Sequence, residues 1–218
     1  MEKFLSFFTD ILIEALGQTI YMVGISTILA TLIGFILAIV LVVTDDGGLK
    51  PNKIINSILG FIVNTLRSFP FIILVVAIIP LTRAIVGKSI GETAALVPLT
   101  IGAAPFIARV IEGALKEVDK GLIEAAKSFG ASNFQIIFKV MVKEAMPSII
   151  SGITLSIISI IGYSAMAGAV GAGGVGAVAL TYGYQRFDNA VMAYTVITLI
   201  IIVQLLQGAG NLAYRKLK

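Results

Sequence analysis

The feature that most constrains the fold of this chain is a stretch of 26 residues, 18–43, that contains no charged side chain. As an α-helix it would be about 39 Å long, which exceeds the hydrocarbon core of a bilayer, about 30 Å. A single segment in lipid can satisfy its backbone polar groups internally only as a helix. The stretch therefore predicts a tilted transmembrane helix.

Composition extends this prediction to the rest of the chain. Only 13% of the residues are charged, about half the share in soluble domains, and the mean hydropathy is +1.03. We predict an all-α, polytopic membrane protein with five transmembrane helices. Their expected bounds are about 18–43, 58–81, 93–108, 146–169 and 190–212. Kinks are expected at the prolines of the second and third spans, which are Pro70, Pro80, Pro98 and Pro105.

The two ends of the chain are expected to lie outside these spans. Residues 1–17 are predicted to form an amphipathic helix on the membrane surface, because apolar residues recur there at helical spacing. The apolar positions are Phe4, Phe8, Ile11, Leu12 and Ala15, with Glu2, Lys3, Asp10 and Glu14 off the stripe. The acidic residues disfavour a signal peptide. Residues 213–218 are expected to form a basic cytoplasmic tail.

Orientation is predicted from Lys and Arg, which are enriched in cytoplasmic loops of membrane proteins. With the first loop, residues 109–145 and the tail on one side, that side holds 12 of the 16 basic residues. They are Lys50, Lys53, Arg67, Arg109, Lys116, Lys120, Lys127, Lys139, Lys143, Arg215, Lys216 and Lys218. The N-terminus is thus expected outside and the C-terminus in the cytoplasm. The assignment of Arg67 depends on whether this residue lies within the membrane.

Between the third and fourth spans, residues 119–145 are predicted to form a helical hairpin in water. Asp119 is the expected N-cap of the first helix, and Gly130 is its left-handed stop. Ser132 and Gln135 have the spacing of a capping box for the second helix. The expected apolar faces are Leu122, Ala125, Ala126 and Phe129 on the first helix and Phe134, Ile137, Phe138, Met141 and Ala145 on the second. The tip, with its small residues, would either enter a groove of another protein or fold onto its own membrane domain.

Several kinds of site are excluded by composition. The chain has no cysteine and no histidine, so disulfides, thiol chemistry, histidine-ligated metals and histidine-based triads are ruled out. No catalytic residue, metal ligand or cofactor is expected. The net charge of +4 comes from residues beside the spans, which indicates membrane topology rather than binding to nucleic acid.

Three local patterns resemble nucleotide or DNA sites but lack the required context. Residues 171–176 match GxGxxG, but a membrane helix precedes them, so the glycines are expected to allow close backbone packing or a re-entrant turn. Residues 87–89 resemble the end of a P-loop, but Thr82 stands where the leading glycine is required. The helix–Gly–helix pattern at 119–145 has spans on both sides and nearly balanced charge, which argues against a DNA-binding helix-turn-helix.

The predicted fourth span places Ser156, Ser159, Tyr163 and Met166 on one helical face. Hydroxyls and a thioether in a row suit a translocation path for a small zwitterion, and Met166 is a candidate gate because it is the bulky side chain in an Ala/Gly run. Alternatively, the hydroxyls bond the backbone one turn back or a neighbouring helix. Arg67 is either a functional charge within the membrane or snorkels to the cytoplasmic surface.

Residues 124–147 carry a resemblance to a known family. Glu124-Ala125-Ala126, followed after three residues by Gly130 and closed by Pro147, resembles the EAA motif of binding-protein-dependent ABC importer permeases. Met146 stands where leucine is usual. The resemblance implies a type I ABC importer permease fold, in which a coupling helix at 124–131 docks into a cleft of a cytoplasmic ATPase. The residues that it assigns to coupling are Glu124, Ala125, Ala126, Lys127, Gly130 and Ala131.

Residues 67–72, 80–83, 98–109 and 162–174 resemble the methionine-uptake subfamily of these permeases. This resemblance covers nearly all of the chain and implies transport of methionine, in its D and L forms, across the bacterial cell membrane. It also implies two ATPase subunits, which hydrolyse the ATP, and an external binding protein. Tyr182, Tyr184 and Arg186 are candidates for contacting the binding protein, or else they form an aromatic belt at the membrane surface.

Five spans are few for enclosing a solute path, so a homodimer about a two-fold axis is predicted. The chain itself is not expected to be an enzyme. The alternatives are a permease for another small amino acid, an ATP-independent carrier and a non-transporting membrane scaffold. The carrier is disfavoured because no Asp or Glu falls within the five predicted spans.

Overall fold

The computed structural model describes residues 11–218, which contain helices and no strands. The long helices are α2 (Ile13–Thr44), α6 (Glu92–Lys116), α9 (Val142–Gly168) and α11 (Asn189–Leu217). The shorter segments are α3 (Lys53–Ser68), α4 (Phe71–Ala77), α5 (Ile79–Val86), α7 (Lys120–Ser128), α8 (Asn133–Gln135), α10 (Gly174–Val178) and two π-helical turns, η2 (Ile136–Met141) and η3 (Ala179–Tyr184).

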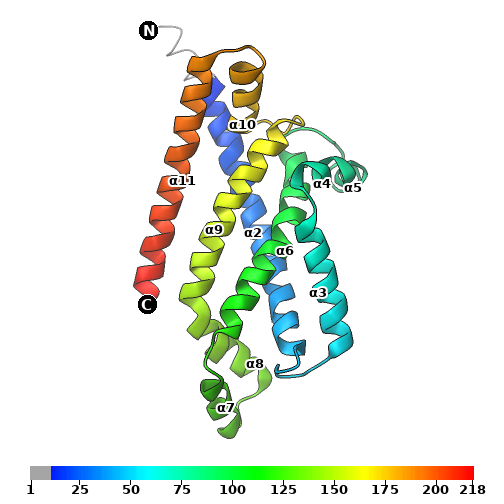
Figure 1. Cartoon of the computed structure of the whole chain (residues 1–218), viewed down its shortest axis with the longest axis vertical. Helices are drawn as coiled ribbons and strands as arrows, with labels where there is room; N and C mark the ends of the chain where they lie inside the picture. Colours follow the sequence, from blue (N-terminus) through cyan, green and yellow to red (C-terminus); the bar gives the residue numbers. More distant parts are fainter. Residues whose placement is uncertain (1–10) are drawn as a thin grey trace.

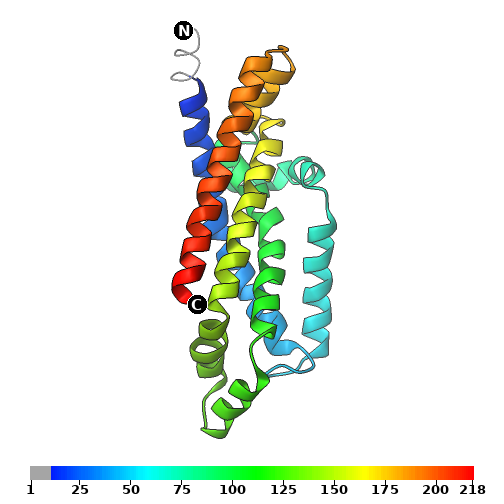
Figure 2. The same ribbon diagram turned by 60° about the vertical axis from the view of Figure 1, so that its left-hand side comes forward.

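The long helices run along one common direction, and α7 and α8 project beyond one end of the bundle (Figure 1). We call this the hairpin end, and the opposite end, where α10 lies, the loop end. Figure 2 shows the same arrangement from another side, with α3 standing beside α6. The chain enters α2 at the loop end, and α11 runs from the loop end towards the hairpin end.

Four helical segments among the described residues are long and apolar enough to cross a membrane: α2, α6, residues 133–168 and α11. The second predicted span, 58–81, corresponds to α3 and α4, which are bent by 104° relative to each other and count as a fifth span only if taken together. Pro70 explains the break. It cannot donate a backbone hydrogen bond, and it keeps Phe69 in extended backbone with ψ of 126°.

Other boundaries also differ from those expected. Residues 1–10 lie outside the described part of the chain, and with them most of the predicted amphipathic helix. Its described end is not separate, because α2 begins at Ile13, and Leu12 and Ala15 are buried against α10. Helix α6 continues through both of its prolines to Lys116, and the helix of the fourth span begins at Asn133.

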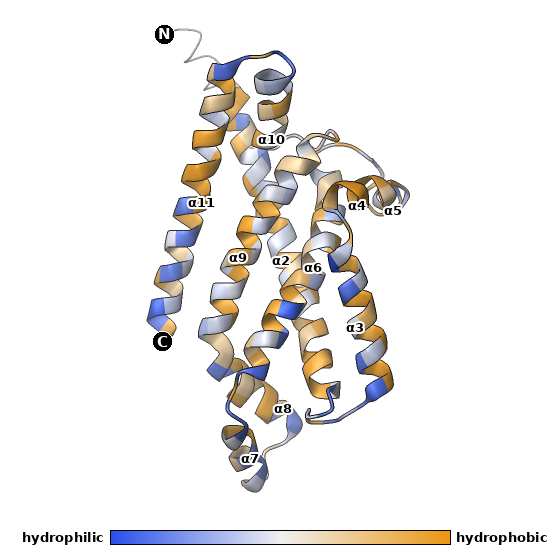
Figure 3. Ribbon diagram, viewed as in Figure 1, coloured by the Kyte–Doolittle hydropathy of each residue, from blue (hydrophilic) through white to orange (hydrophobic). Residues whose placement is uncertain are grey.

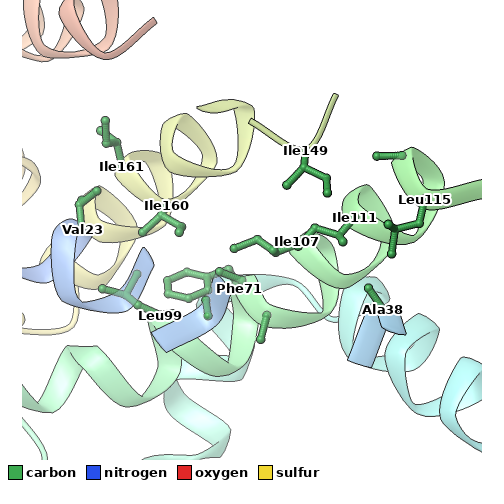
Figure 4. Packing of buried hydrophobic residues seen from close by; sticks show 14 of the residues in the cluster. Val23, Ala38, Phe71, Leu99, Ile107, Ile111, Leu115, Ile149, Ile160 and Ile161 are labelled. Carbon is green, nitrogen blue, oxygen red and sulfur yellow. The ribbon is translucent and has the colours of Figure 1, made fainter. Parts of the chain in front are cut away.

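The core is built around α6, which packs between α2 and α9. In its most apolar part 67% of the residues are buried, against 11% for α11, so α6 is the axis of the bundle and α11 a peripheral helix. Figure 4 shows Ile107 and Ile111 of α6 beside Ile149 of α9. A Cβ added at Gly34 of α2 would lie 2.9 Å from the Ala104 carbonyl oxygen, so α2 and α6 approach at backbone distance.

The outer surface remains largely apolar. Figure 3 shows hydrophobic residues along α3 and hydrophilic residues in the loops and in α7. On α3, Ile54 and Phe61 are each 72% exposed, which is far more apolar surface than a water-soluble helix presents. Such faces are suited to contact with lipid or with another membrane subunit.

Candidate functional site

The hairpin between α6 and α9 forms from local signals. The backbone N–H of Gly121 donates to Asp119 Oδ1 at 2.7 Å, which caps α7. At the other end Gly130 has φ of 77°, and its N–H donates to the Lys127 carbonyl at 2.9 Å. This left-handed stop turns the chain sharply. The predicted cap and stop are both confirmed.

The second arm starts with the predicted capping box. The N–H of Ser132 donates to Gln135 Oε1 at 2.9 Å, and the N–H of Gln135 donates to Ser132 Oγ at 3.3 Å. The arm is not an independent helix, because α8, η2 and α9 continue as one helical segment from residue 133 to 168. Any displacement of the hairpin tip is thus connected directly to the fourth span.

The surface of α7 differs in part from the predicted apolar face. Ile123 and Ala126 turn towards the core, while Leu122, Ala125 and Phe129 face outwards. Phe129 is 90% exposed, a fraction that is costly in water without a partner. Of the residues assigned to coupling, Glu124, Ala125, Lys127 and Gly130 are exposed, whereas Ala126 and Ala131 are half-buried.

A Cβ added at Gly130 would meet no atom within 4 Å. The tip of the hairpin is therefore open on the side where Phe129 is exposed. Small residues and one large aromatic side chain thus share a surface at the hairpin end, which is the arrangement expected of a contact that enters a groove.

Sequence reasoning missed an ionic network directly behind the hairpin. Arg109 Nη1 lies 2.6 Å from Glu112 Oε2, and Lys116 Nζ lies 3.0 Å from Glu112 Oε1 and 2.9 Å from Asp45 Oδ2. Arg109 Nη2 also donates to the Gly60 carbonyl at 3.2 Å. The network ties α6 to the end of α2 and to α3. Its sequence signal is the spacing of three and four between the charged residues of α6, which supports ion pairs on a helix.

The four residues of the proposed path do not share one environment. Ser156 is buried, and its hydroxyl donates to the Gly152 carbonyl at 2.8 Å; the hydroxyl of Ser159 donates to the Leu155 carbonyl at 3.2 Å. Both hydroxyls thus bond to the backbone one turn back, which is the alternative to a role in the translocation path. Met166 is 48% exposed near the loop end.

Tyr163 stacks on Phe71 of α4, with ring centroids 4.6 Å apart and planes 11° from parallel. Both rings line a hollow of about 100 Å³ together with Arg67. Residues of α3 and α6 also line the hollow. Tyr163 therefore shares a site with Arg67 and not with the serines of its own helix.

Arg67 is counted above with the cytoplasmic residues unless it lies within the membrane. It lies in the last turn of α3, about 21 Å along the helix from Lys53. Lys53 follows the loop at the hairpin end, so Arg67 lies at the far end of α3 from that loop, and it is exposed in the single chain. Without Arg67, the basic residues still give the larger count on the side of the hairpin.

At the loop end, the glycine-rich segment packs backbone against backbone, as predicted. Cβ atoms at Gly168 and Gly176 would collide with the backbone of α10 and α9 respectively. The N–H groups of Gly174 and Val175 donate to Gln18 Oε1 and Thr19 Oγ1 of α2, at 2.7 and 3.0 Å. These bonds fix the segment to the start of the first span.

The predicted binding-protein contacts lie just beyond this segment. Arg186 stacks over the ring of Tyr182 at 4.4 Å, and Tyr184 is 67% exposed. Among the described residues no cluster of acidic side chains could hold a metal ion.

The comparisons with known proteins agree with this geometry. Residues 30–216 match the family of binding-protein-dependent transport system inner membrane components. The Probable D-methionine transport system permease protein MetI of Vibrio cholerae is 49% identical over 208 residues, 95% of this chain and 92% of that protein. The methionine import system permease protein MetP of Bacillus subtilis is 47% identical over 172 residues, 79% of this chain and 78% of that protein.

A solved structure of the MetNI methionine ABC transporter, in an inward-facing conformation, contains a chain that is 44% identical. Its TM-score is 0.94, and the match covers 95% of this chain and 96% of that chain. Sequence, fold and the exposed hairpin thus give one answer: the chain belongs to the family of binding-protein-dependent transport system inner membrane components.

Proposed function

We propose that this chain is the membrane-spanning permease of an ATP-driven importer of methionine. It acts as a homodimer with two cytoplasmic ATPase subunits and an external binding protein. The observation that carries the proposal is the hairpin, whose EAA residues lie beside an exposed Phe129 at one end of a membrane bundle. The names of the relatives support methionine as the substrate.

The chain is proposed to be the conduit and not the enzyme. Residues 124–131 dock into the ATPase, and closure of the two ATPase subunits displaces this segment. Because the second arm is continuous with α9, the displacement reaches the fourth span without crossing a flexible loop. Glu124 is exposed and free to pair with a basic residue of the ATPase, a contact worth about 1–3 kcal/mol if it is desolvated.

The proposed orientation places the hairpin end and the C-terminus in the cytoplasm and the N-terminus outside. The basic residues of the hairpin and of the 45–52 loop support it. The outer loops then receive the binding protein, and Tyr184 and Arg186 are exposed at that end.

Uptake in reconstituted vesicles tests the whole proposal. The chain is assembled with the ATPase and binding protein encoded beside it, and ATP-dependent entry of radiolabelled methionine is measured. Gly130→Trp is expected to abolish uptake and to release the ATPase from the purified complex. Gly130→Asn is the matched control, because asparagine tolerates the left-handed backbone without filling the groove.

Two results would redirect the assignment. Uptake that needs neither ATP nor the ATPase would show that the chain is an ATP-independent carrier and not part of an ATP-driven importer. ATP-dependent uptake of another amino acid, with none of methionine, would keep the importer and discard the substrate.

Met166 is proposed to be part of the gate, since its side chain is the bulky one in a run of Ala and Gly and is exposed near the loop end. Met166→Ala is expected to raise ATP turnover in the absence of substrate, or passive leak of methionine. Leu155→Ala is the control on the same helix, also at an exposed apolar position. Equal turnover and leak in wild type and Met166→Ala would remove Met166 from the gate.

A further inference from the structure

The hollow beside Arg67 lies at mid-length of α6, and its lining includes the exposed residues Arg67 and Phe69. Gly102 and Phe106, which line it, flank the midpoint of α6. The break between α3 and α4 forms another part of its wall, through Leu66 and Phe69. Irregular backbone at membrane depth is tolerated where it lines a cavity, because there its polar groups can reach water or a ligand.

Arg67 has no compensating charge in this hollow. Among residues 11–218 the ion pairs involve Arg109, Lys116 and their acidic partners, and no hydrogen bond of the Arg67 side chain occurs there either. The lining of the hollow contains no Asp or Glu. Arg67 is exposed beside the hollow, and an ionisable side chain that faces a cavity at membrane depth marks a candidate functional site.

The walls of the hollow are held in place by packing. A Cβ at Gly102 would lie 3.1 Å from Phe71 Cδ2 and 3.3 Å from Leu74 Cδ2, so this glycine lets α4 sit directly on α6. Phe71 in turn stacks on Tyr163 of α9. Figure 4 shows Phe71 between side chains of α6 and α9, such as Leu99 and Ile160. The hollow is therefore walled by α4, α6 and α9, which pack on one another, together with the end of α3.

The chemistry of the lining selects one class of ligand. A guanidinium binds a carboxylate through two parallel hydrogen bonds. The rings of Phe69, Phe106 and Tyr163 offer apolar surface, favourable contacts to a thioether and negative ring faces to an ammonium group. A volume of about 100 Å³ equals that of about three water molecules, which suits the head group of an amino acid with its side chain directed outwards.

We propose that this hollow is a transient binding site for the amino-acid substrate inside the permease, with the free carboxylate held by Arg67. The inference rests on the proposed function. It adds that the permease itself, and not the binding protein alone, recognises the α-carboxylate. A substrate analogue without that carboxylate is therefore not retained in the hollow.

The absence of cysteine from this chain provides the test. A single reporter, Leu66→Cys, places a thiol in the lining without altering Arg67 or the aromatic rings. Its rate of alkylation by a small maleimide is measured in the assembled complex without binding protein, and the labelled chain is separated by mass. Methionine is compared with methionine amide, which lacks the carboxylate. Lys88→Cys, in an exposed loop, controls for general effects on the reagent.

Methionine at about three times its dissociation constant occupies about three quarters of the sites and slows alkylation about fourfold. The amide is expected to leave the rate unchanged, and so is methionine when Arg67→Gln is added to the reporter. Arg67→Lys keeps the charge but not the two parallel bonds, so it should give partial protection. The comparison with the amide requires no change at Arg67, so it remains decisive if an Arg67 variant fails to assemble.

Equal protection by methionine and its amide, or no protection by methionine while the same complex imports it, would overturn this inference and leave the proposed function standing. Failure of the complex to import methionine would instead remove the proposed function on which the site depends.

Discussion

Two arginines of the membrane domain differ in one decisive respect. Arg109 is compensated on two sides, by Glu112 at 2.6 Å and by the Gly60 carbonyl at 3.2 Å. Arg67 has no such partner among the described residues, and it is exposed beside the hollow. Gly60 and Arg67 belong to the same helix, so α3 is tied to α6 near the hairpin end and carries a free guanidinium at its other end. The first arginine serves the fold, and the second is available to a ligand.

The largest effect is expected from Glu112→Ala, which tests whether the ionic partners of Arg109 stabilise the fold. Glu112 is 6% exposed and holds both Arg109 and Lys116, so its loss leaves two cations without their shared acid. Because Lys116 is 42% exposed and keeps Asp45, and Arg109 is 24% exposed, the cost is expected to be about 1–3 kcal/mol, less than for a fully buried pair. The thermal unfolding temperature of the purified protein should fall sharply.

Glu112→Gln is the matched control, since the amide oxygen can still accept a hydrogen bond from Arg109. It should lie between wild type and Glu112→Ala in stability. If Glu112→Ala unfolds at the wild-type temperature, the network is not a structural tie.

Arg67→Gln should show the opposite pattern. Removing an uncompensated charge is expected to change stability by less than about 0.5 kcal/mol. ATP-dependent uptake of methionine should fall about tenfold or more, which corresponds to about 1.4 kcal/mol of lost interaction. Uptake and thermal unfolding are measured on the same preparation. A large loss of stability with unchanged uptake would reverse the roles assigned to the two arginines.

Phe71→Leu tests the packing of the wall of the hollow beside Arg67. Phe71 is 7% exposed and stacks on Tyr163, so the change removes one ring and keeps apolar volume. Stability is expected to fall by about 1 kcal/mol. Protection of the Leu66→Cys reporter by methionine should weaken without disappearing, because Arg67 remains. Leu74→Met, a conservative change on the same short helix, should leave protection as it is.

The smallest effect is expected at Asp45, at the edge of the compensated network. The hydrogen bond from Lys116 lowers the pKa of Asp45 below its ordinary value of 3.8, against the opposing effect of burial. The folded state therefore favours the carboxylate. Its contribution to stability is complete above pH 3.8 and is lost as the pH falls through the lowered pKa.

Asp45→Asn should accordingly be less stable than wild type by less than about 1 kcal/mol at neutral pH, as for partly exposed salt bridges. The difference between the two proteins should shrink as the pH falls below 3.8 and vanish once it is below the lowered pKa of Asp45. Chemical unfolding at several pH values measures it, and a difference that grows in acid would contradict the assignment.

The sequence by itself determined the features that depend on neighbouring residues. The Asp119 cap, the Gly130 stop and the Ser132–Gln135 box could be predicted because each involves atoms within about four positions of the chain. The uncharged stretch at 18–43 determined a long helix for a similar reason, since a helix satisfies its own backbone.

Tertiary structure decided the rest. Pro70 predicts a kink in the sequence. The angle of 104° between α3 and α4, however, depends on where α4 packs against α6 and α9. The inward turn of Ile123 on α7 likewise depends on the core beneath it.

The meeting of Arg67 with Tyr163 joins positions that are far apart in the sequence, and no local pattern signals it. Hydrophobic burial is non-directional, so a sequence shows which side chains avoid water but not which distant ones will meet. Only the packed bundle decided that Arg109 would have ionic and hydrogen-bonding partners among the described residues and that Arg67 would have none.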